Sequence, residues 1–469
     1  MYTYYLAVDI GASSGRHILG HVEDGRIFLE EVYRFDNSMV EADGHLCWNL
    51  DMIFREVKQG LIKCREAGKI PVSMGIDTWA VDYVLLDGHD RILGPTYAYR
   101  DHRTEKMDIE VSKLISEQEL YSRTGIQKQL FNTIYQLYAH KMQSPDILEN
   151  AQTLLMIPDY LNFLLTNVKS NEYTNATSTG LVSAVARDWD RELIDVLGYP
   201  QRLFGKLSMP KTLLGRFSPE IIEEVGFDCE VVLPATHDTG SAFLAVPACD
   251  ENAFYISSGT WSLMGTELPC PVINEDSRLA NLTNEGGYDY RYRYLKNIMG
   301  LWIIQCIRKE LGNKYSFDEM SRMASENSHF TTQIDVNHSS FLSPVSMTEA
   351  IRDYCRKTGQ AVPGTVGELL QCVYASLAKS YAETLGQLAK LTGKSCSSIN
   401  IVGGGSQNDY LNQLTANYTG KTVYAGPTEG TALGNIMVQM IRTGEFSDLF
   451  EARAAIPGSF EIRKIEPVI

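Results

Sequence analysis

The sequence predicts a soluble α/β protein of two domains, and three observations lead to this expectation. The chain has 469 residues, whereas a single domain usually holds about 100–200 residues. Hydrophobic residues make up 44% of the chain and charged residues 21%, a balance that supports packed cores. Strand-like and helix-like segments alternate, and one strand-turn-strand pattern occurs twice, near residues 4 and 253. We therefore expect domains at 1–245 and 246–469.

The net charge and the lengths of the apolar runs limit the kinds of partner and the location that we expect for this chain. A net charge of −16 and a pI near 5.1 argue against nucleic acid, because a phosphate backbone is bound by a basic face. The first apolar run is too short for a secretion signal, and no segment approaches the ~20 apolar residues of a membrane span. We expect a cytoplasmic protein without a membrane partner that is a monomer or a small homo-oligomer.

The nine cysteines are scattered, odd in number and without the spacing of metal ligands. This usage is typical of reduced thiols in the cytosol. Cys355 and Cys372 lie near the facing ends of two expected helices, with a loop containing glycine and proline between them. A helical hairpin would bring their Cα atoms within the ~4.4–6.8 Å range of a disulfide. We favour two separate thiols and keep the bridge as the alternative.

Apolar and alternating runs predict the strands. Residues 4–10 and 26–35 are expected strands, with a turn at Asp24-Gly25. Two further strands are expected on either side of Asp77-Thr78. Residues 253–265 repeat the strand, small-residue turn, strand arrangement of the beginning of the chain. The repetition suggests two domains of related topology.

Apolar residues at helical spacing predict helices at 50–67, 105–124 and 365–392. Gly125 and Gly393 are expected to end the second and third of these helices. Residues 431–444 are predicted to form the last major helix. Gly434 within it indicates a close approach to a neighbouring backbone.

Three turns rich in small residues are candidate nucleotide-binding loops, the first two for phosphate and the third for the base or ribose. The first is DIGASSGR at 9–16, where glycine and serine allow backbone amides to face an anion. Within it, Asp9 is a candidate ligand of Mg²⁺ through water, and Arg16 is a candidate contact of a terminal phosphate. An ordinary hairpin turn explains the segment equally well, and the Walker pattern GxxxxGK[ST] is absent here.

The second turn, SSGTWS at 257–262, has the same composition, and the third is VGGGSQN at 402–408. The third turn follows an apolar strand and precedes a helix, so its glycines would let a base or ribose lie against the backbone. Each turn alone is weak evidence, but loops from two domains are able to hold one triphosphate. The spacing differs from GxGxxG, so we expect no dinucleotide site.

Asp238 is the candidate general base. It follows the apolar run EVVLPAT and precedes a stretch of small residues that predicts the start of a helix. A carboxylate there, facing an inter-domain cleft, is able to accept a proton from a substrate hydroxyl. An aspartate in this place is more often an N-cap, and from the residues alone the cap is favoured. His237 beside it is either a site residue or a structural histidine.

Two smaller polar clusters are weaker indications of a sugar-binding site than the candidate base. Trp79 beside Asp77 combines an aromatic surface with a carboxylate, although core packing is the commoner role of tryptophan. Asp101 and Arg103 fit a surface ion pair of little consequence.

Ten phrases resemble the FGGY family of carbohydrate kinases and occur in the family's order from residue 7 to about residue 435. They are AVDIGASSGR, GIDTWAVDYVLLD, AYRDHRT, MIPDYLNFLLT, EYTNAT, THDTGSA, SSGTWSLMG, NEGG, YRYLKNIMGLW and VGGGSQN. Each phrase is weak alone, whereas ten in order are highly specific. The resemblance implies a two-domain actin-like, ribonuclease-H-like ATPase fold with an inter-domain catalytic cleft, and ATP with Mg²⁺.

The resemblance also implies roles for single residues, with Asp238 as the catalytic base. The residues that would contact ATP are Ala12, Ser13, Ser14, Gly15, Arg16, Thr260, Gln305 and Gly404. The residues that would line the sugar are Ala80, His237, Asp238, Thr239 and Asn297. The family usually has glycine in the place of Ala80.

The implied reaction is transfer of the γ-phosphate of ATP to the 1-hydroxyl of L-rhamnulose. The nearer alternative is another ketose kinase of the family, acting on L-fuculose, xylulose or ribulose. The more distant alternative is a non-catalytic actin-like assembly ATPase. The candidate base and the phrases on the sugar side argue against the second alternative.

Overall fold

The computed structural model describes residues 2–248 and 250–468, which form two compact units. The first unit consists of Met1–Ala245, Glu267–Tyr294 and Thr431–Ser459. The second consists of Val246–Thr266, Leu295–Gly430 and Phe460–Ile469. The first unit therefore combines segments from both ends of the sequence.

A mixed sheet of six strands is the centre of the first unit. Its strands are β1 (Tyr4–Ile10), β2 (Ser14–Glu23), β3 (Arg26–Asp36), β6 (Pro71–Thr78), β13 (Leu213–Arg216) and β14 (Glu230–Val232). They lie in the order β13-β14-β6-β1-β2-β3, with β1 antiparallel to β2 and parallel to β6. The predicted strands and turn are confirmed. Asp24 and Gly25 have φ of 50° and 74°, as a type I′ hairpin turn requires.

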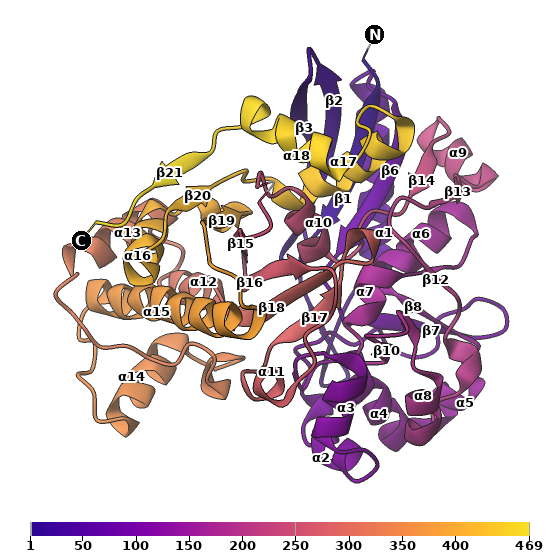
Figure 1. Ribbon diagram of the computed structural model, residues 1–469. Helices are drawn as coiled ribbons and strands as arrows, with labels where there is room; N and C mark the ends of the chain where they lie inside the picture. Colours follow the sequence, from indigo (N-terminus) through magenta and orange to yellow (C-terminus); the bar gives the residue numbers. More distant parts are fainter. Residues whose placement is uncertain (1, 249, 469) are drawn as a thin grey trace. The chain divides into compact units, whose positions relative to one another are not determined.

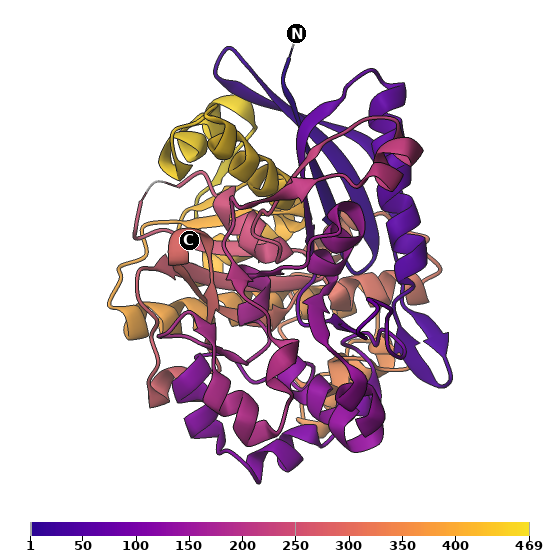
Figure 2. The same ribbon diagram turned by 90° about the vertical axis from the view of Figure 1, so that its right-hand side faces the viewer.

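Helices cover both faces of this sheet. The helix α1 (Leu50–Glu66) lies on one face, and α17 (Gly430–Thr443) and α18 (Leu449–Ser459) lie on the other (Figures 1 and 2). Strand β2 contacts both layers, because side chains of a strand alternate between its faces. His17 donates its ring Nε2 to the carbonyl oxygen of Val57 in α1 at 3.0 Å. Gly20 lies against Ile436 of α17.

The remainder of the first unit consists of short elements. Its short strands are β4 (Val40–Ala42), β5 (His45–Cys47), β7 (Tyr83–Leu86), β8 (Thr153–Met156), β9 (Asn171–Glu172), β10 (Val182–Ser183), β11 (Asp188–Trp189) and β12 (Leu207–Ser208). Its other α-helices are α2 (Met107–Ser112), α3 (Glu117–Thr124), α4 (Thr133–Gln143), α5 (Pro145–Asn150), α6 (Ile157–Thr166), α7 (Tyr173–Thr177), α8 (Arg191–Leu197), α9 (Pro219–Val225), α10 (Asp238–Leu244) and α11 (Glu275–Leu279). Its 3-10 turns are η1 (His102–Thr104), η2 (Gln201–Leu203) and η3 (Tyr288–Tyr290).

A second sheet repeats the topology of the first. Its strands are β15 (Phe254–Ser258), β16 (Trp261–Leu268), β17 (Thr283–Gly286), β18 (Tyr292–Met299), β19 (Ile399–Val402), β20 (Val423–Ala425) and β21 (Arg463–Ile465), in the order β17-β18-β16-β15-β19-β20-β21. Strand β15 is antiparallel to β16 and parallel to β19, as β1 is to β2 and β6. The predicted repetition is thus confirmed.

The helices of the second unit include the longest one, α15 (Val366–Thr392). The side chain of Thr365 and that of Glu368 form a capping box at its start, and Gly393 ends it with φ of 69°, as predicted. The other helices are α12 (Trp302–Glu310), α13 (Phe317–Glu326), α14 (Met347–Lys357) and α16 (Asp409–Thr419), with 3-10 turns η4 (Ser339–Phe341) and η5 (Gly404–Gln407).

The single helix predicted at 105–124 is wrong, because α2 and α3 are separate. Ser116 lies between them and accepts a hydrogen bond from the backbone amide of Glu119 at 3.1 Å, which caps the start of α3. The apolar spacing continues across this cap, so the spacing alone did not reveal the break. Gly125 ends α3 with φ of 65°, as predicted.

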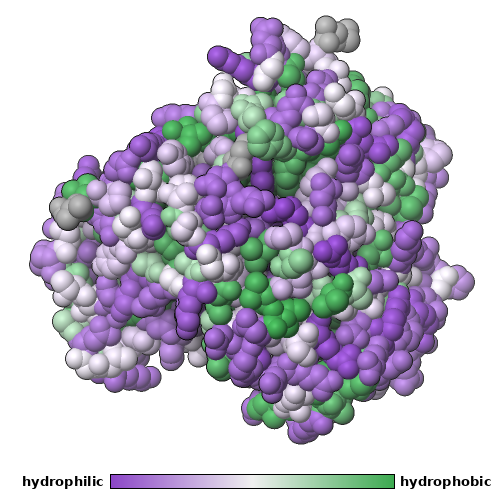
Figure 3. Space-filling view, viewed as in Figure 1, coloured by the Kyte–Doolittle hydropathy of each residue, from purple (hydrophilic) through white to green (hydrophobic). Residues whose placement is uncertain are grey.

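None of the helices that the structure describes is both long and apolar enough to cross a membrane. The face drawn in Figure 3 is largely hydrophilic, with hydrophobic patches scattered between polar residues.

Gly434 allows α17 to lie against the backbone of α10, as its position in the sequence predicted. A Cβ atom on Gly434 would lie 1.8 Å from the carbonyl oxygen of Ser241. No side chain is accommodated at that distance without a shift of one helix. The contact sets the distance between α17 and the helix that begins at Asp238.

We predict that Gly434→Ala lowers the free energy of unfolding by about 1–3 kcal/mol or more, because the methyl group must separate the two helices. Gly386→Ala is the matched control. Gly386 lies in α15, and a Cβ atom there meets nothing within 4 Å, so alanine should stabilise that helix by roughly 0.5–1 kcal/mol. Thermal and urea unfolding measure both changes. Equal shifts in the same direction would contradict the packing argument.

The two cysteines considered from the sequence are in contact. Cys355 of α14 and Cys372 of α15 are buried free thiols, and each thiol shifts the pKa of the other. Contact with the Cys355 thiol, together with burial, raises the pKa of Cys372. The expected proximity is present, and both residues are reduced.

We predict that a thiol count under denaturing, non-reducing conditions gives nine free thiols, one for each cysteine of the sequence. The variant Cys355→Ser should lose one thiol. A disulfide between Cys355 and Cys372 gives a different result. The unsubstituted protein then shows two free thiols fewer than nine. The variant shows one more than the unsubstituted protein, because the substitution leaves Cys372 unpaired.

Candidate active site

Two parallel strands end side by side and bring two aspartates together. In the register of β1 and β6, Asp9 is the partner of Asp77. Thr78, the last residue of β6, forms an isolated parallel bridge with His237. The chain that enters α10 at Asp238 is therefore fixed to the same sheet edge, where the carboxyl ends of β1 and β6 lie.

Asp77 is fully buried near like charges. Asn435 of α17 donates its side-chain amide to Asp77 Oδ2 at 2.6 Å. Burial and the neighbouring Asp9 carboxylate raise the pKa of Asp77 well above its ordinary value, the Asn435 hydrogen bond opposes this rise, and Asp238 adds to it. The three aspartates therefore influence one another electrostatically.

Asp238 is the first residue of α10, and the N-cap position belongs to His237. The capping role favoured from the sequence is therefore wrong. Its Oδ1 accepts hydrogen bonds from the backbone amide of Thr239 at 2.5 Å and from the Thr239 hydroxyl at 3.1 Å, and 32% of its side chain is exposed. Burial raises the pKa of Asp238, His237 lowers it, Asp9 raises it, and the net direction is upward. Such a carboxylate is a better proton acceptor than an ordinary one.

His237 is oriented by two buried charged residues. Arg293 donates Nη2 to His237 Nδ1 at 3.2 Å and lies 3.1 Å from Glu285. The Glu285 carboxylate is also 3.3 Å from the same Nδ1. Because arginine only donates hydrogen bonds, Nδ1 is the acceptor and the imidazole proton resides on Nε2. That nitrogen lies 3.4 Å from Asp238 Oδ1.

Glu172 accepts hydrogen bonds from Thr236, in the segment that leads to Asp238. It is fully buried, and its Oε2 accepts hydrogen bonds from the Thr236 amide at 3.1 Å and the Thr236 hydroxyl at 2.8 Å. The same oxygen accepts from the Thr174 hydroxyl at 2.6 Å. No pattern of charge or spacing in the sequence indicated a role for Glu172, Glu285 or Arg293. The only indication was that each falls in a phrase shared with the kinase family.

Residues 11–13 form the turn between β1 and β2. The Gly11 amide donates to the Ser14 carbonyl oxygen at 2.9 Å, and the Asn37 side chain donates to the Gly11 carbonyl oxygen at 2.8 Å. Ala12 is half-buried and Ser13 is exposed. The hydrogen bond from Asn37 stabilises the turn, and Ser13 is exposed to solvent.

Gly15 and Arg16 follow this turn in β2. A Cβ atom on Gly15 would lie 2.1 Å from the ring of Phe35, so packing alone accounts for this glycine. The Arg16 Nη2 pairs with Asp9 Oδ2 at 2.6 Å. The first candidate loop thus joins a cation to the aspartate at the end of β1.

The second candidate loop connects β15 to β16 and adjoins α12. The carbonyl oxygens of Gly259 and Thr260 accept the amides of Leu301 and Trp302, both at 3.1 Å. Gln305, in the first turns of α12, is half-buried. Thr260 and Gln305 therefore come from adjoining elements.

Two glycines of the third loop are explained without a ligand, one by its backbone conformation and the other by packing. Gly403 has φ of 87°, and a Cβ atom on Gly405 would lie 2.0 Å from Ser258 Oγ. A Cβ atom on Gly404 would meet nothing within 4 Å. Gly404 therefore has open space beside its backbone, and its expected contact with ATP stays a prediction. Asn297 lies in β18 and is half-buried.

Trp79 is a core residue rather than an exposed sugar platform. It is 6% exposed and its ring lies 4.1 Å from that of Trp48, centroid to centroid. Both indoles donate to Asp82 Oδ2, Trp48 at 2.6 Å and Trp79 at 3.0 Å. Half-buried Ala80 follows Trp79 in this turn, and its carbonyl oxygen accepts the Asp82 amide at 2.9 Å.

Asp101 and Arg103 are both buried, so the expected surface ion pair is wrong. Arg103 donates to the carbonyl oxygen and the side chain of Gln136, both at 3.0 Å. Asp101 faces His45 instead.

Two sheets of matching strand order, both with small-residue turns at their strand ends and the first also with aspartates there, define a duplicated α/β fold. Solved sugar kinases share it. A ligand-bound xylulose kinase from Lactobacillus acidophilus has a TM-score of 0.81 at 18% identity, covering 99% of this chain and 94% of that chain. A Plasmodium falciparum glycerol kinase with ADP has a TM-score of 0.77 at 14% identity, covering 98% and 94%.

Family models identify the chain more closely. The N-terminal domain of the FGGY family of carbohydrate kinases matches residues 4–245, and the C-terminal domain of that family matches residues 254–443. The chain belongs to the FGGY family of carbohydrate kinases.

Curated relatives match nearly the whole chain. A rhamnulokinase from Halalkalibacterium halodurans is 50% identical, covering 98% of this chain and 98% of the relative. One from Oceanobacillus iheyensis is 49% identical, covering 97% of both. One from Bacillus subtilis is 40% identical, covering 99% of this chain and 95% of the relative.

Proposed function

We propose that this chain transfers the γ-phosphate of ATP to the 1-hydroxyl of L-rhamnulose, giving ADP and L-rhamnulose 1-phosphate in rhamnose catabolism. The observation that carries the sugar assignment is the identity of 50% and 49%, over 98% and 97% of this chain, to two relatives named rhamnulokinase. Membership of a carbohydrate kinase family supports the kinase reaction itself.

Asp238 is the proposed general base. As the 1-oxygen of the sugar attacks the γ-phosphorus, its proton passes to the Asp238 carboxylate, and the bond from the γ-phosphorus to ADP breaks. The raised pKa of Asp238, caused first by burial, supports this role because it brings the carboxylate closer to the basicity that proton transfer needs. Its partial exposure leaves the carboxylate open to a substrate.

The proposed sugar-lining residues are Ala80, His237, Thr239 and Asn297, together with the base. The Arg293 hydrogen bond leaves the His237 proton on Nε2, so His237 offers a donor next to Asp238. Thr239 holds one oxygen of Asp238. This leaves the other carboxylate oxygen for the sugar hydroxyl.

The proposed ATP contacts come from the three loops and α12. They are Ala12, Ser13, Ser14, Gly15, Arg16, Thr260, Gln305 and Gly404. Phosphoryl transfer depends mainly on positioning and on donors that stabilise charge on the phosphoryl oxygens. Open space beside Gly404 and the adjoining positions of Thr260 and Gln305 support their share of this role.

The residues at the strand ends fit the divalent cation that accompanies ATP in this family. Carboxylate oxygens are the ligands that such a cation prefers. Asp77 Oδ1 is buried and has no hydrogen-bond partner among the residues that the structure describes. We propose Mg²⁺, held by Asp9 through water. When bound, the ion neutralises part of the phosphate charge.

We predict that Asp238→Asn lowers turnover by roughly 10²–10⁴-fold, the usual effect of losing a general base, while sugar and ATP still bind. Asparagine keeps the shape of the side chain and one acceptor oxygen but takes up no proton. A coupled ADP-release assay measures turnover, and calorimetric titration measures binding. Near-normal turnover in this variant would exclude Asp238 as the base.

Asp190→Asn is the matched control for this prediction. Asp190 is the N-cap of α8, and its Oδ1 accepts the Leu193 amide at 3.0 Å. Asparagine caps helices about as well as aspartate, so both the melting temperature and turnover of this variant should stay close to those of the unsubstituted protein. The control separates loss of a proton acceptor from a general effect of the substitution.

We predict that L-rhamnulose has the highest kcat/KM among purified ketoses in the ADP-release assay. A site that hydrogen-bonds the hydroxyls of its substrate discriminates strongly against analogues that lack them. The panel includes L-fuculose, D-xylulose and D-ribulose. A higher kcat/KM for one of these would replace the sugar assignment and keep the kinase. ADP release that is independent of any sugar would instead favour an assembly ATPase.

A further inference from the structure

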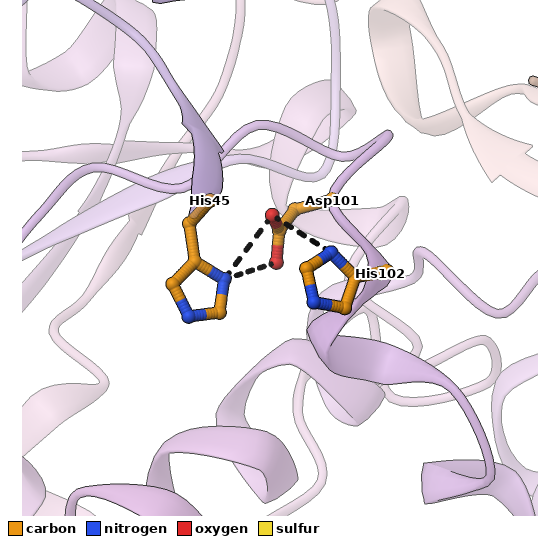
Figure 4. Close-up of side chains that lie close together, drawn as sticks. All are labelled: His45, Asp101 and His102. Atoms are coloured by element: carbon orange, nitrogen blue, oxygen red, sulfur yellow. Dashed lines mark hydrogen bonds and ion pairs between the residues drawn. The ribbon is translucent and has the colours of Figure 1, made fainter. Parts of the chain in front are cut away.

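His45, Asp101 and His102 form a cluster that the proposed kinase reaction does not use. Within the described part of the chain, these residues each offer one ligand atom, and the three atoms lie within 4.8 Å of one another. Figure 4 shows the two imidazole rings on either side of the Asp101 carboxylate, each with its Nδ1 turned toward it. We propose that the three side chains bind a divalent transition-metal ion, with Zn²⁺ as the best fit.

Asp101 is held in a fixed position. Only 1% of its side chain is exposed, and its oxygens accept the backbone amides of Leu46 at 2.8 Å and Arg103 at 2.9 Å. His45 Nδ1 is a third donor to the carboxylate, at 3.0 Å from Oδ1. Each carboxylate oxygen has a second lone pair, which faces the histidines.

The hairpin of β4 and β5 holds His45 in place relative to Asp101. Its strand β5 is joined to residues 96–98 by backbone hydrogen bonds from Trp48 to Thr96 at 2.8 Å and from Ala98 to Leu46 at 2.9 Å. His102 follows Asp101 directly in the 3-10 turn η1. The ligands are therefore positioned by backbone structure before any ion binds, which favours tight coordination.

The distances suit a tetrahedral ion. Zn²⁺ binds nitrogen and carboxylate oxygen at about 2.0–2.2 Å, so neighbouring ligand atoms in a tetrahedron lie about 3.3–3.5 Å apart. His45 Nδ1 lies 3.0 and 3.2 Å from the two Asp101 oxygens, and His102 Nδ1 lies 3.7 Å from Oδ2. These values lie on both sides of the tetrahedral distance. The two imidazole rings are stacked, with 5.3 Å between centroids and 6° between planes, so both rings would have to turn for their Nδ1 atoms to converge on one ion.

The ligand types select the class of metal. Two imidazoles and one carboxylate suit Zn²⁺ and similar transition metals, whereas Mg²⁺ and Ca²⁺ prefer oxygen ligands alone. Three protein ligands leave a fourth position for water. Binding would use the Nδ1 lone pair of His45, so the proton that Nδ1 now donates to Asp101 would move to Nε2, and the bound imidazole would stay neutral.

Solvent reaches the cluster from one side. The side chains of His45 and His102 are 30% and 65% exposed, so an ion is able to enter without local unfolding. The nearby cation does not block it, because the Arg103 guanidinium lies over the Tyr97 ring at 4.1 Å and bonds Gln136. The site is distinct from the Asp9 and Asp238 region by its residues and by its nitrogen ligands.

The test uses the full-length, tag-free protein, stripped of metal with a chelator and kept free of nucleotide. Titration with Zn²⁺, followed by calorimetry and by metal analysis after gel filtration, should give one ion per chain. Co²⁺ should give visible absorption typical of low-symmetry nitrogen and oxygen coordination. His45→Gln and His102→Gln should each weaken binding by at least about tenfold, the lower end of what even indirect ligand partners contribute.

The variant His89→Gln is the control, because His89 is an exposed histidine of the same unit that lies outside the cluster. It should bind Zn²⁺ like the unsubstituted protein. His102→Gln removes a mostly exposed ring, so it tests the site even if His45→Gln perturbs the hairpin. The proposal is overturned if the unsubstituted protein binds no stoichiometric Zn²⁺ in the micromolar range, or if the double variant His45→Gln, His102→Gln binds it unchanged.

Discussion

The in-register parallel pairing of β1 with β6 is the constraint on which the candidate site depends. It places Asp9 opposite Asp77, and the next residue of β6 fixes the segment that leads to Asp238. A shift of one residue would turn one aspartate to the other face of the sheet. The apolar residues Leu6, Val8 and Ile10 of β1 lie fully buried, so core packing specifies the register, and the register in turn specifies which charges meet.

Bringing like charges together is unfavourable, and the surrounding polar groups offset part of this cost. Asn435 donates to Asp77, and Gln439 of the same helix bonds Ser73 and the Leu6 carbonyl oxygen. Gln439 and Asn435 also bond each other. These amides join α17 to strands β1 and β6. Buried polar groups of this kind are tolerated only when each one finds partners.

The two sheets share their pairing but differ in chemistry at the equivalent place. Where β1 and β6 carry Asp9 and Asp77, the paired strands β15 and β19 carry Ser257 and Val402. One sheet thus carries a pair of carboxylates near its strand ends, and the other carries a serine opposite a valine that is followed by glycine. Repetition supplied two similar frameworks, and substitution at a few strand ends gave them different chemistry.

Much of this framework could be predicted from the sequence, because strand alternation and helix spacing are local patterns. The strands at 4–10 and 26–35, the long helix with its Gly393 end and the close approach at Gly434 were all expected and are present. The break at Ser116 was missed because apolar spacing continues across it. The roles of Glu172 and Arg293 could not be predicted from spacing, since their partners are distant in the sequence.

The arrangement of segments in the first unit has a consequence for the order of synthesis. When the ribosome has completed residues 1–245, the strands of the first sheet exist, but α17 and α18 have not been made. The face of β2 around Gly20, which Ile436 later covers, is then open to water or to a chaperone. The core of the first unit is therefore complete only after almost the whole polypeptide has been synthesised. A nascent chain that stops before α17 would remain incompletely folded.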